Sequence, residues 1–176
     1  MSPRAVFGLS VLLGLVSSSV AAVLLVEPAL RTLDSRTALL WLVAPHMFLR
    51  FIGLSFLVPG VVAGSLPAAW AVPAAYGDFV AGILAIIATV GLTRRSSWAG
   101  AAVWIFNLWG AADLVFAFVR GARVNLEPGS LGAGYYLVTA IVPLLLVSHA
   151  LVLGLQVRVF GGTRRRAVHP TGEVVR

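Results

Sequence analysis

Six polar side chains stand inside long apolar runs of this sequence, and they are His46, Arg50, Asp78, Asn107, Asp113 and His149. Imidazoles and carboxylates ligate metals and carry protons, and a guanidinium pairs with carboxylates or with the acidic groups of a cofactor. In apolar surroundings such groups are costly unless they are paired or face a cavity. They therefore form the candidate site, with helix-to-helix adhesion as the alternative role.

The runs that must position these residues have membrane-spanning length. The chain of 176 residues is 60% apolar and 11% charged, whereas charged residues make up about a quarter of a soluble domain. Five apolar segments are separated by charges, glycines and prolines, and each is long enough to cross a hydrocarbon core of about 30 Å as a helix. The sequence predicts an all-α integral membrane protein, a five-helix transmembrane domain over residues 1–160 with spans at about 5–26, 38–62, 71–92, 98–119 and 134–157.

The two histidines are predicted to share one depth. Each lies eight residues from the same-side end of its span, which corresponds to about 12 Å of helix. Two neutral imidazoles at one level on different helices are what axial ligation of haem b requires, and Arg50, one turn from His46, is placed to pair with a propionate. We therefore predict a cofactor site of His46, His149 and Arg50, with haem b as the first choice.

The two aspartates are predicted to share a second depth, about 10 Å from the opposite surface. The helix face around Asp78 carries only alanine and glycine, so its side chain should point into the bundle. Asp113 shares its face with Arg120, a possible partner, and Arg50 is placed to reach either carboxylate. Together with Asn107, these residues form a buried polar set that is a candidate proton relay.

Three further interpretations stand beside haem binding. Polar pairs that specify packing would make the chain an accessory or assembly protein, and a relay through the two layers would make it a small proton-coupled transporter. A mixed His and Asp metal site is disfavoured, because the depth estimates separate the layers by about 12 to 15 Å. We therefore predict no metal ligands.

Catalytic chemistry has no signature in this sequence. There is no cysteine, and all thirteen basic residues are arginine, so disulfides, thiolate ligands and Schiff-base lysines are absent. We find no phosphate-binding glycine loop, no usable Ser, His and Asp constellation and no zinc-protease motif. No catalytic residue is predicted, and whether the chain is an enzyme stays open.

The arginines predict the orientation. Excluding Arg50, three lie on one side of the five spans and nine on the other, so the positive-inside rule places the N-terminus outside and the C-terminus in the cytoplasm of a multi-pass cell-membrane protein. The first span has no ionisable residue after Arg4 and should lie at the periphery of the bundle. Its alternative interpretation is a cleaved signal peptide, because Ser19, Val20 and Ala21 resemble a cleavage site.

The C-terminal segment, residues 161–176, is predicted to be a disordered, basic, cytoplasmic tail. Contacts to anionic lipid headgroups, each worth about 1 kcal/mol, are expected from Arg158, Arg164, Arg165 and Arg166. The predicted partners are membrane lipids and a homo-oligomer or larger membrane complex. Nucleic acid is excluded as a partner despite the net charge of +7, because the chain is membrane-embedded.

Overall fold

The computed structural model describes residues 1–168, with side chains through residue 158. It is all-α, and its described part holds five helical segments that are long and apolar enough to cross a membrane. The predicted fold class is therefore confirmed.

Each membrane-spanning segment is built from one to three helical elements. The first segment comprises α1 (Pro3–Ala21), η1 (Ala22–Val26) and α2 (Glu27–Arg31). The second comprises α3 (Ser35–Val43), α4 (His46–Leu49) and η2 (Phe51–Leu57), the third is α5 (Ala68–Thr93), and the fourth is α6 (Ala99–Arg123). After η3 (Pro128–Leu131), the fifth comprises α7 (Gly134–Tyr136), η4 (Leu137–Ile141) and α8 (Val142–Val168).

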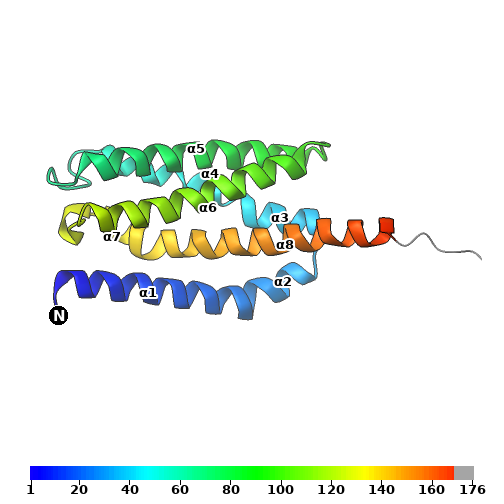
Figure 1. The fold of residues 1–176 in the computed structure, drawn as a ribbon, viewed down its shortest axis with the longest axis horizontal. Helices are drawn as coiled ribbons and strands as arrows, with labels where there is room; N and C mark the ends of the chain where they lie inside the picture. The colour runs from blue at the N-terminus through cyan, green and yellow to red at the C-terminus, as the bar shows by residue number, and fades with distance from the viewer. Residues whose placement is uncertain (169–176) are drawn as a thin grey trace, which may run out of the picture.

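The first segment lies at the edge of the bundle, as predicted. In Figure 1, α1 runs beside α8, on the side away from the α5–α6 hairpin. None of its residues is buried. Its closest approach is at Gly14, where a Cβ atom would overlap the Thr139 carbonyl and lie 3.0 Å from Pro143 Cγ. Pro143 has no N–H to donate to that carbonyl. Helix α1 therefore meets the fifth segment where η4 joins α8.

The second segment is a broken helix. Pro45 interrupts it between α3 and α4, and the backbone then tightens into the 3₁₀ turns of η2. Arg50 occupies the joint, where the Gly53 N–H donates to the Arg50 carbonyl at 3.1 Å. A proline removes a backbone donor, and 3₁₀ geometry inside a helix often marks a hinge. The segment ends at Leu57, five residues before its predicted end, and an irregular connection leads to α5.

Local capping fixes the helix ends at the end of the bundle where α8 ends, which we call the tail end. Asp34 begins α3 by accepting from the Arg36 and Thr37 N–H groups. The hydrogen bond from the Thr37 hydroxyl, at 2.6 Å, holds the pKa of the Asp34 carboxyl below its usual value. Arg36 in turn donates to the last carbonyls of α5, including that of Thr93 at 2.7 Å. These contacts tie the beginning of the second segment to the end of the third.

Two apolar clusters sandwich the middle of the bundle. One gathers buried residues near the tail end, including Leu42, Val103 and Val152, and the other gathers residues near the N-terminal end, including Phe56 and Leu131. The polar side chains of the candidate site lie between them. This arrangement excludes water from both sides of the site except where cavities reach it.

The chain connections sort the arginines by end, as the five spans require. The N-terminus and the α6–α7 connection lie at one end of Figure 1, and the α2–α3 and α5–α6 connections lie at the other. Helix α8 continues to Val168 at that second end. The structure contains no membrane, so which end is cytoplasmic stays a prediction. The side chains of Arg164, Arg165 and Arg166 and the final residues of the predicted tail lie outside the described residues.

Candidate functional site

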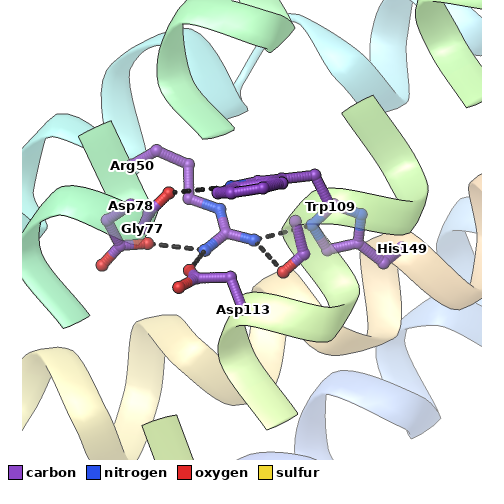
Figure 2. A network of polar contacts seen from close by, with 7 residues as sticks. Arg50, Gly77, Asp78, Trp109, Asp113 and His149 are labelled. Carbon is purple, nitrogen blue, oxygen red and sulfur yellow. Dashed lines mark hydrogen bonds and ion pairs between the residues drawn. The ribbon is translucent and has the colours of Figure 1, made fainter. Parts of the chain in front are cut away.

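Arg50 is the centre of a buried polar network. Its side chain is 0% exposed and meets groups from three neighbouring helices. Figure 2 shows its guanidinium between Asp78 and Asp113 on one side and His149 on the other. Nη2 donates to the Gly110 carbonyl at 2.5 Å. Because Arg50 stands at the joint of the broken second segment, that joint sets the position of the whole network.

Both carboxylates bind the same guanidinium nitrogen. Arg50 Nη1 lies 2.5 Å from Asp78 Oδ1 and 3.1 Å from Asp113 Oδ2. Both carboxylate side chains are 9% exposed. The predicted pairing of Arg50 with the aspartates is thus present, and one arginine serves both. Two carboxylates with one guanidinium carry a formal charge of −1 when both are ionised.

His149 connects the network to α6. Its Nε2 lies 2.9 Å from Arg50 Nη2, and its Nδ1 lies 2.7 Å from Asn107 Oδ1. Arginine is a donor only, so Nε2 must accept and Nδ1 must donate to the amide oxygen. These roles assign His149 as the neutral tautomer with its proton on Nδ1.

His46 extends the site toward the first segment. Its ring centroid lies 4.6 Å from that of His149, and Phe106 stands edge-on against it at 5.0 Å. Its Nε2 lies 3.1 Å from the Ser148 hydroxyl, which also reaches the Leu42 carbonyl at 3.3 Å. The two histidines are therefore neighbours, as predicted from their equal depth.

Three glycines allow the network to form. A Cβ atom at Gly53 would overlap the Asp78 carboxyl, and one at Gly77 would overlap that of Asp113. A Cβ atom at Gly110 would lie 2.5 Å from His149 Cε1 and 2.9 Å from Arg50 Nη2. Each glycine lies on a different helical segment, so three neighbouring segments each offer the polar side chains a stretch of backbone without a side chain.

The predicted separation of the His and Asp layers is wrong, because a single guanidinium contacts Asp78, Asp113 and His149. The error comes from the helix ends. Helix α5 begins at Ala68 and α6 ends at Arg123, each beyond the predicted span end. Each aspartate thus lies ten residues, or about 15 Å, from its helix end, and the two layers merge near the middle of the bundle.

Shared haem ligation does not fit this geometry. Iron held by both histidines would lie between their nitrogens, with the macrocycle separating the two rings. Here the rings touch, Arg50 and Asn107 occupy both His149 nitrogens, and His46 Nε2 faces Ser148. The Arg50 guanidinium also fills the space between the carboxylates and His149, which argues against a shared metal ion there.

Arg120 lies outside the network. It donates through Nε to the Ala69 carbonyl at 2.5 Å, and its guanidinium stands over the Phe116 ring at 5.7 Å. The predicted pairing with Asp113 is not formed, because Arg120 binds the Ala69 carbonyl of α5 instead. Among the predicted lipid-contacting arginines, Arg158 is exposed and lies 3.5 Å from Glu27 Oε1.

Two residues of the site were not predicted from the sequence. Trp70 is 3% exposed and donates through Nε1 to the Ala117 carbonyl at 2.9 Å. Ser148, adjacent to His149, bonds His46 instead of its neighbour. The adjacent histidine is the sequence signal that could have identified Ser148, whereas nothing in the sequence distinguishes Trp70 from interfacial tryptophans.

Two separate cavities reach opposite ends of the network. The first, of about 340 Å³, is lined by Asp78 and Asp113 and extends to Arg4 and Pro128 at the N-terminal end of the bundle. The second, of about 210 Å³, is lined by His46, Ser148 and residues of the first segment. The polar residues thus form a partition between two spaces.

The five-segment core matches a known protein family. Residues 6–157 match the family described as a domain of unknown function, DUF8737. The chain belongs to this family. No curated protein and no solved structure matches the chain. The matched region contains every member of the Arg50 network and ends within α8, one residue before Arg158.

Proposed function

We propose that this family member is a small proton-coupled membrane transporter in which the Arg50 network binds and releases the proton. The observation that carries the proposal is the pair of cavities that reach opposite ends of one buried polar network. Ionisable residues inside transmembrane bundles are rare, and they mark ion pathways and proton relays when they face a water-filled cavity.

Arg50 separates the proton-binding groups of the two cavities. Arginine does not release its protons, so no proton passes directly from Asp113 to His149 while the guanidinium lies between them. A shift of Arg50 is therefore the step that connects or disconnects the two sides. Its position at the joint of a broken helix supports such a shift, because 3₁₀ geometry inside a helix often marks a hinge. Discontinuous spans also form the substrate and ion sites of many transporters.

Bundle assembly is the second candidate function, and one observation favours it. Arg50 has four hydrogen-bonding partners on three neighbouring helices, so the network specifies how the second, third, fourth and fifth segments pack. Buried ion pairs are known to fix packing in some proteins. This role requires no proton movement, which separates it from transport.

A proton-flux measurement tests the proposal. Purified protein is reconstituted into vesicles with an internal pH-sensitive dye, and a pH gradient is imposed. We expect the wild type to dissipate the gradient faster than empty vesicles, and Asp113→Asn to remove the difference. Glu127→Gln is the matched control, because Glu127 is an exposed carboxylate whose only ion pair among the described side chains is with Arg4. Wild-type flux equal to that of empty vesicles, or unchanged flux in Asp113→Asn, would leave the assembly role.

A further inference from the structure

The larger cavity combines an apolar wall with an acidic floor. Aromatic and aliphatic side chains line most of its surface, including Phe56, Trp70 and Val138. Its two acidic lining residues are Asp78 and Asp113, the carboxylates of the network. Its volume of about 340 Å³ is at the lower end of the range for small-molecule sites. A compact ligand with an apolar body matches these dimensions.

The floor presents hydrogen-bond acceptors to the cavity. Arg50 binds Asp78 through Oδ1 and Asp113 through Oδ2, and in the described residues neither carboxylate has a partner on its other oxygen. The Arg50 side chain, at 0% exposure, is absent from the cavity lining and stands behind the carboxylates. A ligand head at this floor therefore meets carboxylate oxygens, which bind donors and cations and repel anions.

The charge of the network also calls for a cation. The groups facing the two carboxylates are Arg50 and, behind it, the neutral His149, with His46 beyond. Arg4, at the far end of the cavity, is exposed and paired with Glu127. One guanidinium balances one carboxylate, and the second carboxylate needs either a proton or a cation in this apolar setting.

We propose that the cavity binds a monovalent organic cation, a protonated amine on a compact apolar body, with its ammonium group at Asp78 and Asp113. The coupling of amine binding to proton release rests on the proposed function, because the cation takes the place of the transported proton at the carboxylates. A carboxylic acid and the ammonium ion give a carboxylate–ammonium pair and one released proton. The aromatic rings of Trp70 and Phe56, 4.9 Å apart, add a surface that attracts cations.

Three molecules with one apolar body test the class of head group. The probes are 1-adamantylamine, 1-adamantanol and 1-adamantanecarboxylate, titrated calorimetrically into detergent-purified full-length protein. We expect the amine to bind at least about tenfold more tightly than the alcohol, as a charge-assisted hydrogen bond predicts, and the carboxylate not to bind. Amine binding should weaken as the pH falls, because protons compete for the same oxygens. Equal binding of amine and alcohol would identify an apolar pocket and overturn the proposal.

Two variants locate the bound amine. Asp113→Asn should weaken amine binding by about tenfold or more, whereas Asp34→Asn, an exposed change at the other end of the bundle, should have no effect. Because Asp113→Asn also disturbs the ion pair, Ala117→Leu is a second variant that fills the cavity without changing charge. It should abolish amine binding in protein that still elutes as a single species. Unchanged amine affinity in Ala117→Leu would overturn the proposal.

Calorimetry in buffers of different ionisation enthalpy separates this proposal from the proposed function. Amine binding with one proton released, but no proton flux in vesicles to which the amine is added, would retain the amine site and reject transport. Asp113-dependent proton flux without preferential amine binding would retain transport and reject the amine site.

Discussion

Arg50 and His149 are joined by a hydrogen bond of 2.9 Å from Nη2 of the guanidinium to Nε2 of the imidazole. This contact makes the histidine an acceptor and directs its proton through Nδ1 to Asn107. Through this contact, Arg50 connects the two carboxylates of the network to its histidines. We expect this link to affect the stability, packing and haem content of the protein.

Removal of the guanidinium should destabilise the protein strongly. Arg50→Leu leaves two carboxylates in an apolar setting without their counter-charge, and loss of one partner from a buried pair typically costs about 3–5 kcal/mol. Thermal unfolding followed by size-exclusion chromatography in detergent measures the loss. The deficit should shrink as the pH is lowered, because protonation neutralises the stranded carboxylates.

The exposed Arg123 supplies the control for this prediction. Arg123→Leu removes the same charge from the end of α6 without disturbing the network, and its unfolding temperature should stay close to that of the wild type. A similar loss in both variants, or a deficit in Arg50→Leu that does not change with pH, would contradict the assigned role of the ion pair.

The glycine beneath His149 should not tolerate a methyl group. In Gly110→Ala the new Cβ would lie 2.5 Å from His149 Cε1, so the imidazole or α6 must move. Overpacking of this kind typically costs about 1–3 kcal/mol. Gly154→Ala in α8 is the control, because a Cβ there meets nothing within 4 Å and helical alanine is favoured over glycine. Equal unfolding temperatures for the two variants would show that the site relaxes freely.

Haem content is tested directly by absorption. Because both His149 nitrogens are engaged and the two imidazoles touch, protein purified from haem-supplemented cells should show no Soret band that depends on the histidines. The comparison requires wild type, His46→Ala and His149→Ala at equal concentration. A Soret band in the wild type that both substitutions remove would overturn this interpretation of the contacts and restore the haem prediction.

The sequence was sufficient to predict the five segments and most members of the network. Apolar runs identify spans well, and an ionisable residue such as Arg50 inside a run is conspicuous because the surroundings contain nothing like it. The pairing of Arg50 with the aspartates also followed, since it is the arginine placed inside the spans. Residue type and hydropathy were therefore enough to identify the site.

The depth and orientation of the side chains were not predictable in the same way. Errors of three residues in the starts of α5 and α3 move Asp78 and His46 toward each other by about 4.5 Å each, which removes most of the predicted separation between the two layers. The long Arg50 side chain, which contacts both aspartates and His149, joins the groups into one network. Trp70 was missed because indoles occur both at interfaces and in cores, and only packing against Phe56 and the Ala117 carbonyl decides between them. Arg120 was misassigned because helix phase does not reveal competition from another helix.

The orientation of the bundle is accessible to labelling because the natural chain has no cysteine. Gly129→Cys introduces a thiol at the end that carries the N-terminus, where a Cβ meets nothing within 4 Å. Ser97→Cys introduces one in the exposed α5–α6 connection at the opposite end. The arginine distribution predicts that a membrane-impermeant maleimide labels Gly129→Cys in intact cells and Ser97→Cys only after the membrane is opened. The cysteine-free wild type gives the background in both conditions. The reverse pattern would place the mouth of the larger cavity at the cytoplasmic surface, and the amine would then be taken up from the cytoplasm.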